Sequence, residues 1–365
     1  MIGERAGYDV GIATGNREAG NVIVTCACWA GNGVASSLPA GLPPGRHLHA
    51  RVLEAFLVFR RSAIFAIAGV ATAALTLSAC GSDSLSTTSS TTPAASGSAS
   101  ASGGGVDAAL AAKLPEKIKS AGVIKIGTDA TYQPNEYLDA DGKTVIGMDV
   151  DLFDAVAAKF GVKTEWVPSA FDSIILGVSS GKYDVGVSSF TVNADRMKEA
   201  TMVSYFKAGT QWVTKKGNPK SVNPDDACGL KVAVQKGTVQ SDTDLPARNK
   251  ACTDAGKAEI TPLVDPDQAK VTAMVQSGKA DAMLVDLPPA IAAVELTNGE
   301  LELLGEQYDS APYGFVLPKS ETDFGAAIVE ALKAIEADGS YKSILTKWKT
   351  EGGAISDFAV NPSVG

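Results

Sequence analysis

The sequence predicts an α/β fold built as two similar lobes. Short apolar segments alternate with segments whose apolar residues recur at helical spacing, the pattern of an α/β protein. The pattern also echoes itself, since residues 174–187 and 271–285 each combine an apolar helix, Ser-Gly-Lys, an aspartate and a buried strand. With 365 residues, the chain is long enough for each lobe to bury its own core.

The elements follow in chain order from their local patterns. Three segments predict strands from their apolar content: residues 123–128, 163–167 and 282–285. Residues 149–160 predict a helix, because acidic residues stand in the first turn and Gly161 follows as a stop. Residues 124–128 and 232–238 both run a strand into Gly-Thr, about a hundred positions apart. In open α/β sheets ligands bind beyond the carboxyl ends of strands, so two facing lobes would enclose a cleft there.

Composition excludes several classes of function. The chain is 45% hydrophobic and 20% charged with a mean hydropathy of +0.07, which is typical of a folded soluble body. A net charge of -9 argues against a nucleic-acid partner, which needs a basic face. The two histidines, His47 and His49, both precede a predicted cleavage site. Histidine-dependent hydrolase and zinc sites are therefore not expected, and we expect no metal, cofactor or catalytic residue.

The first part of the chain predicts an export signal with a lipid anchor. Residues 58–80 place Arg60 and Arg61 before nineteen uncharged residues, the pattern of a signal peptide. They end in Leu-Ser-Ala-Cys, which resembles a bacterial lipobox and makes Cys80 the predicted lipidation site. A permanent membrane-spanning helix ending in a free thiol is the alternative. Residues 1–57 lack periodicity, and we interpret them as an untranslated or disordered extension before a start at Val58.

Residues 81–105 predict a flexible tether, because a Ser/Thr/Ala/Gly tract has too little apolar surface to offset the entropy of ordering. Beyond it, Cys228 and Cys252 remain. In an exported protein such a pair most simply forms a disulfide, and two unpaired buried thiols are the alternative.

Three segments carry a resemblance to a known family: residues 127–136, residues 147–152, and residues 188–191 continuing to 195–196. They resemble the polar amino-acid-binding proteins of ABC importers, solute-binding protein family 3, over about residues 108–350. The resemblance implies a two-lobed type II periplasmic-binding fold with a hinge and an interlobe cleft. Lobe one would contain residues 106–212 and 313–365, and lobe two residues 213–312. It also implies a place on the extracytoplasmic face of the membrane and permease and ATPase partners.

An enclosed amino-acid zwitterion needs partners for both charges, because an unpaired buried charge costs several kcal/mol. A guanidinium fork suits a carboxylate. By similarity, Arg196 binds the ligand α-carboxylate and Asp286 the α-ammonium group. The resemblance adds four further polar contacts: Ser188, Ser189, Thr191 and Thr238. The alternatives are a surface arginine at a helix start and an aspartate that caps a helix.

The side-chain subsite is assigned in the same way. Tyr132 and Phe171 match the family's aromatic walls, although either could be core, and Asp129 matches a contact to the ligand's polar end. Asn135 replaces an aromatic residue of the family pattern, which favours a hydrogen-bonding ligand, glutamine or glutamate. Asp129 instead favours a neutral or cationic ligand, and Gln235 with Lys236 could reverse that preference.

Two other functions remain open from sequence. Some members of this fold are extracytoplasmic cyclohexadienyl or arogenate dehydratases, and a surface lipoprotein without a transport role is the other alternative. The GxSxG sequence at residues 177–181 does not indicate a nucleophile elbow, because it ends a predicted helix and has no histidine partner.

Overall fold

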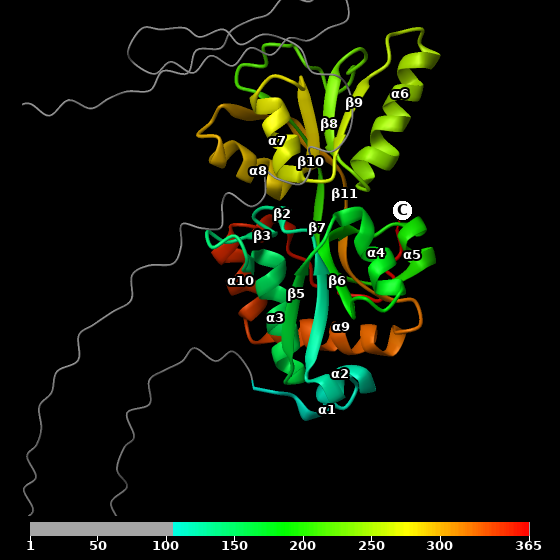
Figure 1. Cartoon of the computed structure of the whole chain (residues 1–365), viewed down its shortest axis with the longest axis vertical. Coiled ribbons are helices and arrows are strands. Elements are labelled where there is room, and N and C mark those ends of the chain that lie inside the picture. Colours follow the sequence, from blue (N-terminus) through cyan, green and yellow to red (C-terminus); the bar gives the residue numbers. More distant parts are fainter. Residues whose placement is uncertain (1–104, 365) are drawn as a thin grey trace, which may run out of the picture. The chain divides into compact units, whose positions relative to one another are not determined.

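A computed structural model describes residues 105–364, which belong to one compact unit. The predicted α/β class is confirmed: helices pack around one mixed sheet of eight strands (Figure 1). The strands of that sheet are β1 (Val123–Thr128), β5 (Lys163–Pro168), β6 (Val185–Thr191), β7 (Ala200–Lys215), β8 (Lys231–Gln235), β9 (Thr261–Asp265), β10 (Ala282–Asp286) and β11 (Leu301–Pro318). A small second sheet contains β2 (Thr131–Tyr132), β3 (Glu136–Leu138) and β4 (Val145–Ile146).

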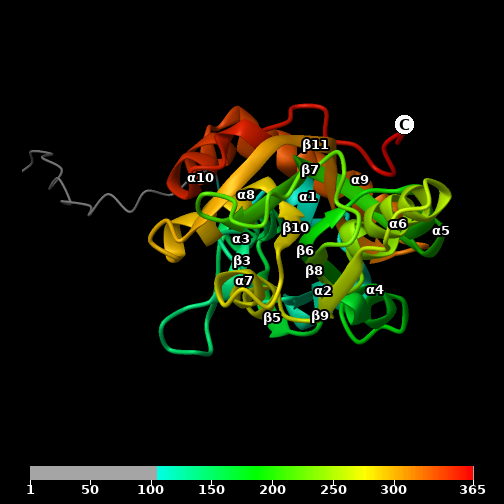
Figure 2. The same cartoon turned by 90° about the horizontal axis from the view of Figure 1, so that it is seen from above.

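The helices lie on both sides of the central strands. They are α1 (Ala108–Ala111), α2 (Glu116–Ala121), α3 (Met148–Phe160), α4 (Phe171–Ser179), α5 (Ala194–Glu199), α6 (Leu245–Asp254), α7 (Gln268–Gln276), α8 (Leu287–Leu296), α9 (Thr322–Ala337) and α10 (Ser340–Trp348). A π-helical turn, Gln240–Asp244, precedes α6, and a 3₁₀ turn, Glu351–Gly353, follows α10. Two views show α3, α7 and α8 on one side and α4, α5 and α6 on the other (Figure 1, Figure 2).

The sheet has two halves joined by its two longest strands. Its order is β5-β1-β6-β11-β7-β10-β8-β9. Lobe one contains β5, β1 and β6, lobe two contains β10, β8 and β9, and β7 and β11 run antiparallel through both. Their register shifts on both sides of Tyr308, and the Gly209 amide there donates to Gln307 Oε1 at 3.1 Å. Irregular pairing at this crossing is what a hinge requires.

Local patterns predicted the elements around the cleft closely. β1 has the predicted bounds, α3 begins one residue earlier at Met148, and β10 extends to Asp286. β1 ends in Gly127-Thr128 and β8 is followed two positions later by Gly237-Thr238, and these two strands stand in different lobes. The lobe limits at residues 212/213 and 312/313 stay predictions.

Each lobe has its own apolar core, which fixes the strand ends that face the other lobe. In lobe one, α3 and α9 bury Phe153, Phe160 and Phe324 against the sheet. In lobe two, α7 and α8 pack on one side of β10, and Cys252 of α6 packs with Trp212 on the other. Burying such side chains contributes about 1.5–3 kcal/mol each.

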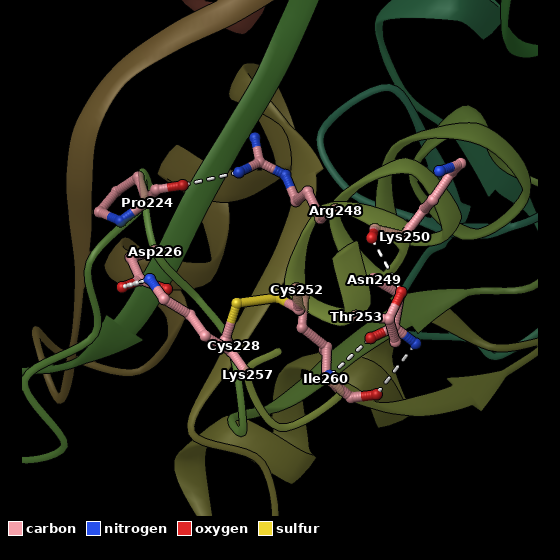
Figure 3. Close-up of a disulfide and its surroundings, with 10 residues drawn as sticks. All are labelled: Pro224, Asp226, Cys228, Arg248, Asn249, Lys250, Cys252, Thr253, Lys257 and Ile260. Atoms are coloured by element: carbon pink, nitrogen blue, oxygen red, sulfur yellow. Dashed lines mark hydrogen bonds and ion pairs between the residues drawn. A yellow bond between two sulfur atoms is a disulfide. The ribbon is translucent and has the colours of Figure 1, made fainter. Parts of the chain in front are cut away.

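Cys228 and Cys252 are bonded in lobe two, with sulfur atoms 2.00 Å and Cα atoms 5.6 Å apart. Figure 3 shows the bond beside two further links to the same loop, one from α6 and one from the segment that follows α6. Arg248 Nη1 donates to the Pro224 carbonyl at 2.6 Å, and Lys257 Nζ to Asp226 at 2.6 Å. Formation of the disulfide in the exported protein stays a prediction.

The predicted extension 1–57, the signal peptide 58–80 with its lipidation site Cys80, and most of the predicted tether lie outside the described residues. Within residues 105–364, no helix is both long enough and apolar enough to cross a membrane.

Candidate functional site

A small cavity lies where strand ends of the two lobes face each other. Its lining comprises Asp129, Tyr132, Glu136, Phe171, Ser188, Ser189, Thr191, Arg196, Gln235, Thr238, Val239, Gln240 and Asp286. Ten of the eleven residues predicted for ligand contact are among them; Asn135 is not. A larger hollow near the hinge is more open and has Lys207 and Lys342 on its rim. Convergence of charged side chains, rather than volume, therefore identifies the site.

Arg196 supplies the positive charge of the cavity. It stands in α5, whose start is capped by the Asn193 side chain accepting from the Arg196 amide at 2.8 Å. Its guanidinium donates to the Thr191 carbonyl at 2.7 Å and, across the lobes, to the Gly237 carbonyl at 3.0 Å. Burial lowers the pKa of Arg196 to about 10, which leaves it charged at neutral pH. The residue is only partly exposed and lines the cavity, which favours a ligand role over the alternative of a surface arginine.

Asp286 supplies a negative charge from lobe two. It occupies the N-cap position of α8, but its side chain makes no capping bond. Instead its carboxylate accepts from Tyr313 at 2.7 Å, Gln240 at 2.7 Å and Tyr132 at 3.0 Å. Burial raises the pKa of Asp286, and these three bonds, with the charge of Arg196, oppose that rise. The carboxylate is thus held in a fixed orientation at the cavity.

Asp129 supplies a second negative charge, at the end of β1. Its carboxylate accepts from Thr131 Oγ1 at 2.7 Å, the Phe171 amide at 3.2 Å and Gln235 Nε2 at 2.7 Å. The bond from Gln235 crosses between the lobes. Burial raises the pKa of Asp129 from 3.8 to about 6, and the charge of Asp267 adds to the rise. No cationic side chain of the described residues forms an ion pair with Asp129, so its charge is only partly compensated.

The two serines within β6 use their hydroxyl protons inside the protein. Ser188 Oγ donates to Glu136 at 2.9 Å, and Ser189 Oγ lies 3.1 Å from Asp149 and 3.3 Å from Glu136. Asn135 is fully buried behind them and donates to Ser189 Oγ at 2.8 Å. This geometry corrects the expected contacts: Asn135 supports Ser189 instead of lining the cavity. Neither hydroxyl proton points to a ligand carboxylate while these bonds hold.

The two predicted aromatic walls, Phe171 and Tyr132, line the cavity and also pack against other apolar side chains. Phe171 lines the cavity and stacks on Phe190 at a centroid distance of 4.5 Å. Tyr132 lines the cavity and also packs into the core of lobe two. Arg196 lies over the rings of Phe171 and Phe190 at 5.3 and 5.4 Å, so cation–π attraction also orients the guanidinium.

Lobe two approaches through the turn after β8. Gly237 has φ +80°, and a Cβ there would come within 2.7 Å of Asp172 in lobe one, so only glycine fits. Thr238 Oγ1 donates to the Gln235 carbonyl at 2.8 Å, which locks the turn. The π-helical turn that follows directs Gln240 toward the cavity, a common use of π-helical geometry.

Sequence reasoning missed Glu136, Val239, Gln240 and, behind Asp286, Tyr313. Two of these residues had a sequence signal that could have identified them. Glu136 stood in the segment that carried the resemblance, and Gln240 follows Gly237-Thr238 by two positions. Tyr313 carried no local signal, because it lies within the long strand β11.

Comparison with known proteins identifies the family. The model of the bacterial extracellular solute-binding proteins, family 3, matches residues 124–351. The chain belongs to this family. The expected resemblance and the two-lobed fold are thereby confirmed, and the family description places its members outside the cytoplasm.

Curated relatives of this family 3 member are named as amino-acid-binding proteins. The arginine-binding protein ArgT of Corynebacterium glutamicum is 32% identical over 253 residues, which are 69% of this chain and 82% of ArgT. The L-cystine-binding protein TcyJ of Escherichia coli K12 is 28% identical over 237 residues, 64% of this chain and 85% of TcyJ.

Solved structures show the same fold. An ancestral arginine-binding protein bound to arginine aligns with a TM-score of 0.57 and 33% identity, over 62% of this chain and 98% of that one. The ancestral amino-acid-binding protein AncCDT-1, described as a precursor of cyclohexadienyl dehydratase, aligns with a TM-score of 0.56 and 30% identity, over 64% and 98%. The chain is therefore an amino-acid-binding member of a transport family, and its ligand is a separate question.

Proposed function

We propose that this protein captures one amino acid with a cationic side chain outside the cytoplasm and delivers it to an ABC importer. The observation that carries the proposal is the set of three charges around one cavity: the buried carboxylates of Asp286 and Asp129 and the partly buried guanidinium of Arg196. Arginine and lysine each bring one carboxylate and two cations, so every charge on the ligand would meet an opposite charge.

The roles follow from position. Arg196 holds the α-carboxylate, Asp286 the α-ammonium group and Asp129 the side-chain cation, while Tyr132 and Phe171 flank the aliphatic chain. Arginine-binding relatives agree with this assignment, since ArgT and the ancestral protein are named for arginine.

Glutamine is the second candidate, and with glutamate it was the ligand expected from sequence. An ancestral arginine-binding protein has also been solved with glutamine, at 32% identity to this chain. Glutamine would leave the charge of Asp129 without a cation, and glutamate would add a like charge beside it. Both ligands should therefore bind more weakly than arginine.

Titration calorimetry with arginine, lysine, glutamine, glutamate and cystine tests the proposal. We expect arginine or lysine to bind with a dissociation constant in the micromolar range or below, and glutamate not to bind. Failure of all twenty amino acids to bind would refute the proposed function. Formation of product from prephenate or arogenate would instead favour a dehydratase, the alternative that AncCDT-1 keeps open.

We also propose that the protein is anchored by lipid at Cys80, within the sequence Leu-Ser-Ala-Cys. Buried acyl methylenes contribute about 0.8 kcal/mol each, so a lipidated chain should sediment with membranes. Cys80→Ser should move the protein to the soluble or secreted fraction or leave its signal uncleaved. Equal membrane association of both forms after carbonate washing would contradict the anchor.

A further inference from the structure

Two segments that carried the family resemblance each place a carboxyl group beneath the cavity. Glu136 stands in β3 and Asp149 in the first turn of α3, and both side chains are fully buried. Both carboxyl groups contact the Ser189 hydroxyl, Glu136 Oε2 at 3.3 Å and Asp149 Oδ2 at 3.1 Å, which brings them within reach of each other. Neither group has a role in the ligand contacts proposed above.

A hydrogen bond between two carboxyl groups requires a proton, because two carboxylates can only accept. The remaining contacts indicate which group is ionised. Asp149 Oδ2 accepts from Tyr205 at 2.6 Å and from the Ser189 amide at 2.9 Å, and the positive end of the α3 dipole lies beside it. Asp149 Oδ1 is buried and receives no hydrogen bond from a donor of the described residues, so it is free to accept one from a protonated Glu136. Glu136, with fewer donors, therefore carries the proton and donates it to Asp149.

The surroundings cannot stabilise a second negative charge. The titratable groups that face Glu136 are Asp129 at the end of β1, Tyr132 of β2, Asp149 of α3 and Tyr205 of β7. The contacts from β6 are the neutral side chains of Ser188 and Ser189. No described cation forms an ion pair with either carboxyl group. Burial and the charge of Asp149 raise the pKa of Glu136 well above its ordinary value.

The pair also determines the position of the cavity floor. Ser188 donates to Glu136 and accepts the Asp129 amide at 3.0 Å, so it connects the pair to the carboxylate proposed for the ligand side chain. Ser189 has φ +50°, a conformation held by its amide and hydroxyl bonds to Asp149. Both serines line the cavity on their other side.

We propose that Glu136 and Asp149 share one proton at neutral pH and that this protonated pair holds Ser188 and Ser189 in place beneath the ligand. Glu136 is thus a positioning residue, and the pair acts on binding through the serines. The inference goes beyond the proposed function, because the shared proton exists whichever amino acid binds.

The shared proton predicts a specific pH dependence of folding. The folded protein keeps a proton on Glu136 that the unfolded chain loses above its ordinary pKa, so stability falls as pH rises toward the folded pKa. Each retained proton raises the unfolding equilibrium constant tenfold per pH unit in this window. In Glu136→Gln the amide donates to Asp149 and the carbonyl accepts from Ser188, with no proton to lose.

Urea unfolding of the full chain without added amino acid, between about pH 5 and pH 9, tests this. We expect the ratio of unfolding constants, wild type over Glu136→Gln, to rise at least tenfold across the range. Titratable groups that do not face Glu136 cancel in this ratio, because both proteins contain them in the same surroundings. Exposed Glu259→Gln is the matched control and should give a flat ratio. A flat ratio for Glu136→Gln would overturn the shared proton.

Binding separates positioning from a purely structural role. With arginine as the probe, Glu136→Leu should bind at least tenfold more weakly than Glu136→Gln, which keeps the hydrogen bonds, with an unchanged circular dichroism spectrum. Equal binding by Glu136→Leu would overturn the positioning role. If wild type binds no amino acid, the proposed function fails, while the stability ratio still decides the shared proton.

Discussion

Replacing Asp129 with asparagine should weaken the binding of cationic ligands and raise the stability of the ligand-free protein. The carboxylate is 3% exposed, and burial raises its pKa from 3.8 to about 6. At neutral pH that rise corresponds to about 3 kcal/mol of unfavourable free energy for holding the charge. A ligand cation at Asp129 would recover this free energy. The protein should therefore bind a cationic ligand about a hundredfold more tightly than a neutral ligand of similar size.

We therefore expect Asp129→Asn to bind arginine about a hundredfold more weakly than wild type and glutamine about equally. The ligand-free variant should be more stable at neutral pH by up to about 3 kcal/mol, because asparagine is neutral and can still accept from Thr131 and Phe171. Calorimetry measures the first effect and urea unfolding the second. Exposed Asp195→Asn, beside Arg196 in α5, is the control and should change neither.

The pH dependence gives the same argument an independent check. The folded pKa of Asp129 is raised, so its charge is lost below about pH 6, and wild-type affinity for arginine should fall there. Affinity of Asp129→Asn should change much less over that range. The reasoning would be refuted if both proteins bound arginine equally well with the same pH profile.

Three further predictions concern other contacts. Arg196→Ala should weaken the binding of every amino acid by at least a hundredfold in calorimetry, because loss of one partner of a buried ion pair costs about 3–5 kcal/mol. Arg196→Lys should recover only part of the lost affinity. Normal binding by Arg196→Ala would exclude the carboxylate role. Tyr313→Phe removes the 2.7 Å bond to Asp286 and should weaken binding by about tenfold, with no change for ligands that lack the α-amino group. Replacing Cys228 and Cys252 with serine should lower the free energy of unfolding by about 3–3.5 kcal/mol for a separation of 24 residues, and thiol titration of the unfolded wild type should find neither thiol free.

The ordered elements followed from local sequence because their causes are local. In α3, acidic residues in the first turn, apolar residues at helical spacing and Gly161 at the end lie within fourteen residues of one another. Apolar residues predicted β1, and a continuous apolar run predicted the buried strand β10; the structure has both in those places. Asp286 ends β10 and Arg196 follows the end of β6 by five positions, and the family resemblance assigned both to the ligand.

The contacts made by these residues did not follow in the same way. Asp286 was interpreted as either a ligand contact or a helix cap, and its bond with Tyr132 spans 154 positions. The serines were expected to donate to a ligand, whereas the fold turns their protons to Glu136 and Asp149. No short-range pattern contains such pairings.

By itself the sequence determined the α/β class, the family and most residues of the cavity, because apolar spacing and short polar segments are properties of neighbouring residues. The tertiary structure alone decided how the charges are partnered: Asp286 with three donors, Asp129 without a cation among residues 105–364, and Glu136 with the proposed proton. The physical reason is that the pKa and hydrogen-bond partners of a buried group depend on what the sheet order brings within a few ångströms of it. That order joins segments from distant parts of the chain.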